Sequence, residues 1–331
     1  MKISVILPCF NGADTVGVQL EALTRQHWND WEVVVVNNGS TDRSMEIVAA
    51  YADRLPKLRI VEAHQPGTER LGVTHSYAVG FAAARGDAFV LCEADDEVGD
   101  GWLAALGHAL LRHEFVAAAL EYERLNSSDI VATGHRQQTA ETGLSNASPP
   151  LYLPFASGCS FGFRRSVYER LGDPDPSCAA TWDQDYCYRA HLAGIALEFV
   201  PAAVVHYRLR TTLRGAYKQG KNWAVASVAC SHKYQPACTE DELLRRQARG
   251  AFELCKHVLK AGFVLASGRT TPNSWVWSLG WWGGIVQGEF GRWLTLKGDQ
   301  LLQREPPALG NVTRLRMPSE EPERSSLAQA G

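Results

Sequence analysis

Four carboxylates lie within five positions of this chain, directly after a run of apolar residues. Residues 89–92 read Phe-Val-Leu-Cys, the composition of a strand buried on both faces, and Glu93, Asp95, Asp96 and Glu97 follow. In an open α/β sheet, ligands bind in the crevice beyond the carboxyl ends of the strands. Carboxylates held this close together repel one another, and a bound divalent cation such as Mg²⁺ or Mn²⁺, carrying phosphate oxygens, relieves the repulsion. The alternative is a solvated acidic turn, and the elements around the cluster distinguish the two.

The composition is that of a globular protein and excludes some classes of partner. The 331 residues are 45% hydrophobic and 21% charged with a formal net charge of −3, which argues against nucleic-acid binding driven by bulk positive charge. The eight cysteines form no CxxC pair and several lie in apolar runs, so we expect reduced thiols and a cytoplasmic protein. No apolar stretch reaches the length of a membrane-spanning helix, and we expect no signal peptide after Met1-Lys2.

Strand-like and helix-like segments alternate in the first third of the chain. Apolar runs predict strands, and apolar residues that recur at helical spacing predict the helices between them. The predicted strands are 3–7, 33–36, 58–62 and 89–92, and the predicted helices are 13–27, one that opens after 42, and 69–84. Short connections between alternating strands and helices predict a parallel sheet with right-handed crossovers. The turn after the first strand reads Pro-Cys-Phe-Asn-Gly and lacks the GxGxxG run of dinucleotide-binding proteins.

The rest of the chain predicts further strands and then a long helical region. Strands are predicted at 115–122, 130–135, 195–200 and 203–207, and helices at 100–113, 165–171 and 183–192. Residues 137–150 are rich in Ser, Thr, Asn and Pro and are expected to form a loop. From about 208 to 297 the pattern is helical, and 303–331 has the Pro/Ser/Glu-rich composition of a disordered tail.

Several short motifs follow one another in an order that is typical of a known family. They are SVILPCFN at 4–11, NNGSTD at 37–42, EADD at 93–96, WDQDY at 182–186 and HYR at 206–208. Over residues 3–222 the chain resembles family 2 glycosyltransferases with the GT-A fold. The resemblance implies an α/β fold with a mixed, mostly parallel sheet flanked by helices. It implies a catalytic domain at 1–208 (a nucleotide-sugar donor half at 1–113 and an acceptor half at 114–208), a helical region at 209–300 and a disordered tail at 301–331.

The resemblance also implies a reaction, the transfer of a sugar from a nucleotide-diphosphate sugar to an acceptor hydroxyl with inversion at the anomeric carbon. The diphosphate leaving group gains negative charge, which Mg²⁺ or Mn²⁺ would stabilise as a Lewis acid. Asp95 and Glu93 are the predicted metal ligands, and His206 is the family-matched candidate for a further ligand. A single histidine after an apolar strand is equally compatible with a core or surface position. Asp96 is expected to hold the ribose or to support the site, and Glu97 to be an ordinary exposed charge.

An inverting transfer needs one general base to take the proton of the attacking hydroxyl. Asp183 occupies the position of this base in the family's motif, although Trp182 stands where the family has a glutamate. Asp185 is the alternative, and it could instead cap the first turn of the helix. We predict Asp183 as the base, because the mouth of the helix is where a substrate can approach.

The loops after the first two strands are expected to hold the nucleoside. Pro8 and Phe10 can flank a base, and Asn11 and Gly39 belong to the same two family motifs. Asn37 stands where many relatives have an aspartate that accepts the uracil imide N–H. Its carbonyl can accept that bond, but its amide can also donate one. The resemblance therefore favours a UDP-sugar, and guanine or thymine donors stay open.

Two further points concern charge in the donor half. Residues 76–78 read Ser-Tyr-Ala where relatives often carry Ala-Arg-Asn, so an arginine that would face the diphosphate is missing. Arg70 and His75 are the candidates to replace it. Asp42 is expected to cap the following helix rather than to touch a ligand.

The C-terminal region bears on the acceptor, which the resemblance implies is a carbohydrate or a lipid-linked molecule. Residues 219–223 are similar to the QxxRW box of processive polysaccharide synthases, but Asn222 replaces the arginine, which predicts single additions. Residues 273–288 carry four tryptophans and no charge. This segment either lies on the inner face of a membrane as a peripheral contact or packs its rings on the catalytic domain.

Two rival functions belong to other classes of protein. A non-catalytic GT-A-like module would bind a nucleotide or glycan without turning it over, because a fold does not fix a function. A sugar-phosphate nucleotidyltransferase would need a glycine- and lysine-rich phosphate loop after the first strand, which residues 8–12 do not supply.

Overall fold

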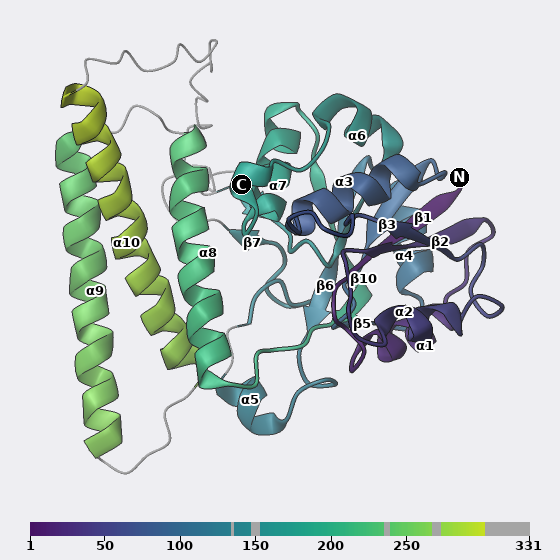
Figure 1. Cartoon of the computed structure of the whole chain (residues 1–331), viewed down its shortest axis with the longest axis horizontal. Coiled ribbons are helices and arrows are strands. Elements are labelled where there is room, and N and C mark those ends of the chain that lie inside the picture. The colour runs from purple at the N-terminus through teal and green to yellow at the C-terminus, as the bar shows by residue number, and fades with distance from the viewer. Residues whose placement is uncertain (134–135, 147–152, 235–238, 267–272, 302–331) are drawn as a thin grey trace, which may run out of the picture.

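The computed structural model describes residues 1–133, 136–146, 153–234, 239–266 and 273–301, which form a sheet domain and a group of long helices beside it (Figure 1). The eight-stranded sheet has the order β3-β2-β1-β4-β9-β6-β10-β5. Its first half is parallel throughout, as the alternating pattern predicted. It consists of β1 (Ile3–Cys9), β2 (Trp31–Asn37), β3 (Arg59–Glu62) and β4 (Ala88–Leu91).

Hydrophobic layers cover both faces of the sheet. Val33 and Val35 of β2 belong to one layer, and Val34 and Val36 belong to the other. Burial on both faces is the reason why these strands are continuous apolar runs in the sequence. The first face is covered by α1 (Val16–Thr24), α2 (Ser44–Ala49) and α4 (Trp102–Leu110), and the second by α3 (Val73–Ala83), α6 (Arg165–Leu171) and α7 (Trp182–Leu192).

The second half of the sheet is mixed. β9 (Phe161–Arg164) runs antiparallel between β4 and β6 (Phe115–Glu121). There is no room for a side chain at Gly162, because a Cβ there would lie 2.6 Å from Val90 Cγ1. β10 (Leu197–His206) is parallel to β6, and β5 (Glu97–Val98) pairs antiparallel with β10. A small sheet of β7 (Ser145–Asn146) and β8 (Pro154–Phe155) and the 3-10 helix η1 (Pro176–Cys178) complete the domain. The predicted mixed, mostly parallel sheet is thus confirmed.

Two predictions in this half are wrong. The strand expected at 130–135 is helix α5 (Ser128–Thr133), and its last two positions lie outside the described residues. Val131 N donates to the carbonyl of Ser127, closing a helical turn that a short apolar run cannot reveal. The strands expected at 195–200 and 203–207 are one strand, β10, whose pairing with β6 shifts register between Val200 and Val204. Pro201 lies at this irregularity, where the missing N–H of proline is tolerated.

Three long helices follow the sheet domain, in agreement with the helical pattern after 208. They are α8 (Leu213–Tyr234), α9 (Glu240–Ala266) and α10 (Asn273–Leu301), and α10 lies against both of the others. The tail expected to be disordered, residues 301–331, falls outside the described residues except for Leu301.

Glycines bring α8 and α10 into close contact. A Cβ on Gly220 would lie 2.3 Å from the carbonyl oxygen of Trp277, and one on Gly280 would lie 2.2 Å from that of Tyr217. The tryptophan-rich segment 273–288 therefore packs on its own chain. In the part of the chain that the structure describes, no helix combines the length and the apolarity that crossing a membrane requires.

Candidate active site

A cavity of about 580 Å³, the first cavity, lies at the carboxyl ends of β1, β2 and β4. This is the edge at which an open α/β sheet binds its ligands. Both carboxylates predicted to hold a metal are found here, together with three arginines and the loops after the first two strands. The residues that line it include Pro8, Phe10, Asn11, Asn38, Arg70, Glu93, Asp95, Arg208 and Arg210.

A second cavity of about 760 Å³ adjoins the first, because Val73, Glu93 and Arg210 line both. Its volume lies in the range of small-molecule sites. Asp183 lines it from the start of α7, and α8 and α10 supply much of the opposite wall. The residues from these two helices include Lys218, Gln219, Asn222, Trp223, Trp277, Trp281 and Trp282.

The acidic cluster is compact. Carboxylate oxygens of Glu93, Asp95 and Asp96 all lie within 4.8 Å of one another. Burial, with Asp95 close by, raises the pKa of Glu93 well above its ordinary value. Arg210 Nη1 lies 3.5 Å from Asp95 Oδ2, and its positive charge does not cancel the repulsion at Glu93. Such a set of hard oxygen donors fits a divalent cation.

Asp96 belongs to this cluster but lines neither cavity. It is 1% exposed and is not among the described residues that line either cavity. Its Oδ1 accepts a hydrogen bond of 2.9 Å from Arg208 N, and its Oδ2 has no partner among the described residues. Burial and the neighbouring Asp95 raise the pKa of Asp96 to about 8. Of the two roles expected for Asp96, this position fits support of the site and does not fit contact with a ribose.

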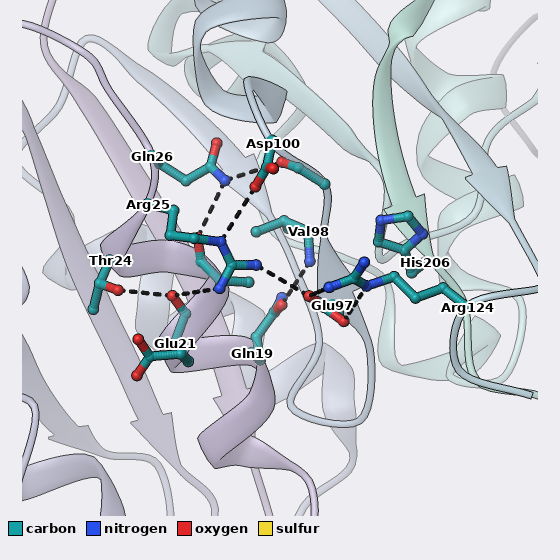
Figure 2. A network of polar contacts seen from close by, with 12 residues as sticks. Gln19, Glu21, Thr24, Arg25, Gln26, Glu97, Val98, Asp100, Arg124 and His206 are labelled. Atoms are coloured by element: carbon teal, nitrogen blue, oxygen red, sulfur yellow. Dashed lines mark hydrogen bonds and ion pairs between the residues drawn. The ribbon is translucent and has the colours of Figure 1, made fainter.

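Glu97 is not the exposed charge that the sequence predicted, and this prediction is wrong. The residue is 5% exposed and belongs to the network in Figure 2. Its carboxylate accepts hydrogen bonds from Arg124 at 2.8 Å and from Arg25 at 3.1 Å. The hydrogen bond from Arg124 lowers the pKa of Glu97. Glu97 therefore ties β5 to α1 and to the segment after β6, and it holds the acidic loop in place.

His206 bonds to Glu121 and is not part of the compact acidic cluster, which does not fit the metal-ligand role expected for it. Its Nδ1 bonds to a carboxylate oxygen of Glu121. It pairs with Glu97 across β10 and β5, and Figure 2 draws both residues. The compact group of possible ligands contains Glu93, Asp95 and Asp96 without it. Successive side chains of a strand point to opposite faces, and the strand places His206 on the face that carries Glu121.

Asp183 is well placed for chemistry. It lies in the first turn of α7 and lines the second cavity. Its Oδ2 accepts a hydrogen bond of 3.1 Å from Gly158 N, and its Oδ1 accepts one of 2.9 Å from Gln184 N. Burial raises the pKa of Asp183 to about 6, which these backbone donors keep from rising further. A carboxylate with such a pKa is ionised at neutral pH and is a stronger base than an exposed one.

Asp185, the alternative base, is committed to other partners. It is fully buried and forms ion pairs with Arg189 at 3.0 Å and with Lys233 at 2.5 Å. Tyr234 Oη also donates to it at 2.6 Å. These contacts join α7 to α8, so Asp185 has a structural role that neither cavity reaches.

Trp182, which replaces the family's glutamate, packs rather than reacts. Its ring lies 4.5 Å from that of Tyr77 and 5.5 Å from that of Phe161, centre to centre. A Cβ on Gly158 would lie 2.5 Å from Trp182 Cζ2. The glycine therefore lets the indole lie beneath the loop whose N–H holds Asp183.

In the second loop, Asn38 lines the first cavity in place of the predicted Asn37. Asn37 Nδ2 donates to Glu62 at 2.8 Å, its Oδ1 accepts from Ser40 N at 2.9 Å, and it lines neither cavity. Asn38 lines the first cavity, and its buried Oδ1 has no partner among the described residues. The base contact predicted for Asn37 therefore does not fit its position. Gly39 is a turn residue outside the cavity, with φ at 77°.

The first loop is placed as expected. Pro8, Phe10 and Asn11 line the first cavity, and Asn11 Oδ1 accepts from Thr41 N at 2.8 Å, which joins the two loops. The Phe10 ring is 41% exposed, and the guanidinium carbon of Arg70 lies 3.8 Å from its centre. A cation held on a ring at this distance is an attractive contact.

Three arginines bring positive charge to the first cavity, and one of them, Arg70, was a candidate from the sequence. Of the two candidates to replace the missing arginine, Arg70 lines the cavity, whereas His75 bonds to the carbonyl of Ala63. Arg208 and Arg210, just beyond β10, were not predicted as site residues. Arg208 Nε donates to the carbonyl of Asp95 at 2.7 Å. The HYR motif was the one available signal for them.

Asp42 bonds to backbone groups of the loops and does not line the first cavity. Its Oδ1 accepts from Ser44 N at 3.0 Å, at the start of α2, and its Oδ2 accepts from Ala13 N at 3.0 Å. The bond to Ser44 N satisfies a backbone N–H in the first turn of α2, although Asp42 lies one position before the N-cap residue, Arg43.

Comparison with known proteins places the chain. Residues 4–172 match the family model described as glycosyl transferase family 2. The probable glycosyltransferase YdaM of Bacillus subtilis (strain 168) is 24% identical over 233 residues, which are 67% of this chain and 54% of that protein. The chain thus spans about half the length of this relative.

Two solved structures share the fold. The mannosyltransferase PcManGT from Pyrobaculum calidifontis, in complex with GDP-Man and Mn²⁺, has a TM-score of 0.54 and 19% identity, over 92% of this chain and 81% of that one. S. aureus TarS 1–349, in complex with UDP, has a TM-score of 0.51 and 15% identity, over 92% of both chains. With the family model covering half of its length, this chain belongs to glycosyl transferase family 2 and has the GT-A fold.

Proposed function

We propose that this chain transfers a sugar from a nucleotide-sugar donor to an acceptor hydroxyl, with inversion and in single additions, assisted by a divalent cation. The observation that carries the proposal is the meeting of two cavities at Glu93 and Arg210. Glu93, Asp95 and the arginines line one cavity, and Asp183 lines the other. A donor in the first cavity would present its anomeric carbon to an acceptor in the second.

Glu93 and Asp95 are the residues that would hold Mg²⁺ or Mn²⁺. Their clustered oxygens and the raised pKa of Glu93 are what a site built for a cation has before it binds one. PcManGT, which shares the fold, was solved with Mn²⁺. When bound, the cation supplies Lewis-acid stabilisation of the diphosphate leaving group. Arg210 and Arg70, which line the same cavity, would add positive charge next to the diphosphate.

Asp183 would act as the general base. The Gly158 N–H holds one carboxylate oxygen at 3.1 Å and fixes the orientation of the group. Its pKa of about 6 leaves it ionised at neutral pH and able to take the proton of the attacking hydroxyl. Because the leaving group would lie in the first cavity and Asp183 lines the second, attack would come from the side opposite the diphosphate, which gives inversion.

The wall of the second cavity favours a carbohydrate acceptor. Trp223, Trp277 and Trp281 line it, and indole rings offer flat apolar faces on which a sugar ring can lie. Asn222 lines the same wall in the place of the arginine of processive synthases. This substitution supports a single addition.

Incubation with UDP-, GDP- and dTDP-sugars tests the proposal, with and without Mn²⁺. We expect slow release of the nucleoside diphosphate from one class of donor, and only when the cation is present. Once an acceptor is found, the anomeric configuration of the product, read by NMR, should be inverted. Donor binding, detected as a rise in Tm, without any hydrolysis or transfer would instead identify a binding module.

Asn38 is proposed as the contact to the donor base, with its free carbonyl oxygen accepting the N3–H of uracil. The variant Asn38→Ala should bind UDP roughly two- to tenfold more weakly, as expected for the loss of one hydrogen bond. Its affinity for CDP should change less, because cytosine has no N3–H. Calorimetric titration measures both. Asn37→Ala is the matched control. It should lower Tm without narrowing the difference in affinity between UDP and CDP. If Asn38→Ala kept the parent's difference in affinity between UDP and CDP, this contact would be excluded.

A further inference from the structure

Helix α9 has a second apolar face that no described part of the chain covers. Phe252 is 67% exposed, Leu259 75% and Phe263 73%. Figure 1 shows α9 as the outermost helix, on the far side of α10 from the sheet domain. Its inner side is a different one, where Leu243 is fully buried and Gly250 lies against Ile285 and Val286 of α10.

The exposed residues form one continuous face. At about 100° per residue, Val258, Leu244, Leu259, Phe252 and Phe263 fall within an arc of roughly 140°. A seam between two paired helices is narrower, with one or two positions in each turn. An arc of this width suits a flat surface more than a second helix.

Basic residues border this face. The helix begins with Glu240, Asp241 and Glu242. After this acidic start, between residues 243 and 266, it has five Lys and Arg residues and one glutamate, in a chain with a net charge of −3. Arg245, Arg249 and Lys256 lie along one edge of the arc, beside Phe263 and Phe252. A copy of the same helix would bring the same positive charge, whereas the head groups of an anionic bilayer would complement it.

We propose that α9 lies on the surface of an anionic lipid bilayer, with Phe252, Leu259 and Phe263 inserted at the level of the head groups. Helices of this kind combine an apolar face with Lys and Arg and lie in the interface without spanning it. The contact differs from the one expected for residues 273–288, because that segment packs on α8 and lines the second cavity. The proposal does not depend on the transfer reaction.

Flotation of the full chain with lipid vesicles tests the proposal. We expect binding to vesicles of phosphatidylcholine with phosphatidylglycerol, and much weaker binding to phosphatidylcholine alone. The triple variant F252S/L259S/F263S should bind vesicles about 10-fold or more weakly, with an unchanged Tm because the three side chains are exposed.

The variant R245E/R249E should bind anionic vesicles about 10-fold or more weakly, and high salt should weaken binding of the parent in the same way. L111S/L192S, which removes exposed leucines of the sheet domain, is the matched control and should bind like the parent.

A second readout keeps the test independent of the folding of the variants. Of the seven cysteines that the structure describes, Cys255 alone is exposed, and it lies within the same arc. In a Cys238→Ser background, the emission of a polarity-sensitive dye on Cys255 should shift to the blue when anionic vesicles are added.

No binding to vesicles and no shift of the dye's emission would overturn the proposal, as would a triple variant that binds as tightly as the parent. A dimer in solution that the triple variant converts to a monomer would assign the face to a second copy instead. Donor hydrolysis measured without vesicles reports on the proposed reaction separately.

Discussion

Replacing Asp183 by asparagine is expected to lower kcat for sugar transfer about 10²- to 10⁴-fold, the usual contribution of a positioned general base. The amide has nearly the same shape but cannot take the proton of the acceptor hydroxyl. Donor affinity should change little, because Asp183 lines the second cavity and the donor is proposed to bind in the first. The measurement is kcat for transfer beside the Kd of the nucleoside diphosphate. A variant that transfers as fast as the parent would remove Asp183 from the role of base.

The pH profile gives an independent check of the same assignment. Burial raises the pKa of Asp183 to about 6, and the base works in its ionised form. The rate of the parent should therefore be level above this pKa and fall about tenfold for each pH unit below it. In Asp183→Asn the residual rate should lose this limb of the profile.

Asp185→Asn is the matched control, because it makes the same chemical change two positions along the helix. Asp185 is fully buried and pairs with Arg189 and Lys233, whose side chains are 20% and 32% exposed. Its loss leaves Arg189 without this partner, while Lys233 keeps its ion pair with Asp175. Breaking a fully buried ion pair costs about 3–5 kcal/mol of folding free energy, and we expect a smaller cost here because both cations reach solvent. We expect a clear drop in Tm, and a smaller effect on kcat of the protein that remains folded than Asp183→Asn has.

Replacing Asp95 by asparagine is expected to abolish the response of the protein to Mn²⁺ and to lower the rate of donor turnover about 10²- to 10³-fold. Loss of a Lewis acid that offsets the charge of the leaving group is worth several kcal/mol. The Tm of the metal-free variant should equal or exceed that of the parent, because Asp95 is one of the like charges that raise the pKa of Glu93. Calorimetry with Mn²⁺, thermal unfolding with and without the cation, and turnover in the presence of a chelator measure the three effects. Full activity of the parent in the chelator would contradict the assignment.

Glu97→Gln is the control from the same acidic run. Glu97 pairs with Arg25 and Arg124, and the hydrogen bond from Arg124 lowers its pKa. A carboxyl whose pKa is lower in the folded state stabilises the protein above its unfolded pKa, and this stability is lost as the pH falls through the folded value. The variant should therefore have a lower Tm at neutral pH and lose part of the acid dependence of its stability. Its affinity for Mn²⁺ should stay close to that of the parent.

Much of the architecture follows from local patterns in the sequence. Strands buried on both faces, such as 33–36, are continuous apolar runs because each face meets its own layer of helices. Alternation with helices then requires parallel strands, whose carboxyl ends share an edge. That is why the loops carrying Pro8, Asn11, Glu93 and Asp95 could be expected to meet at one cavity, as they do. The prediction of a strand at 130–135 failed because an apolar run as short as Ile130-Val-Ala132 fits a helical turn equally well.

The sequence could decide only some choices between neighbouring residues. Asp183 was preferred to Asp185 because it lies at the mouth of the helix, but Asn37 and Asn38 are the same residue type, and composition treats them alike. Glu62 takes the amide of Asn37, and Lys233 takes the carboxylate of Asp185, which leaves Asn38 and Asp183 at the cavities. These partners come from other elements, 25 and 48 positions away in the sequence.

The same reason explains His206, Glu97 and the outer face of α9. His206 turns to Glu121, Glu97 is buried by two arginines, and Phe252 stays exposed because α10 occupies only the opposite side of α9. A residue's own neighbours in the chain set the element in which it lies. The direction of its side chain, and the charge that it meets there, depend on elements that only folding brings alongside.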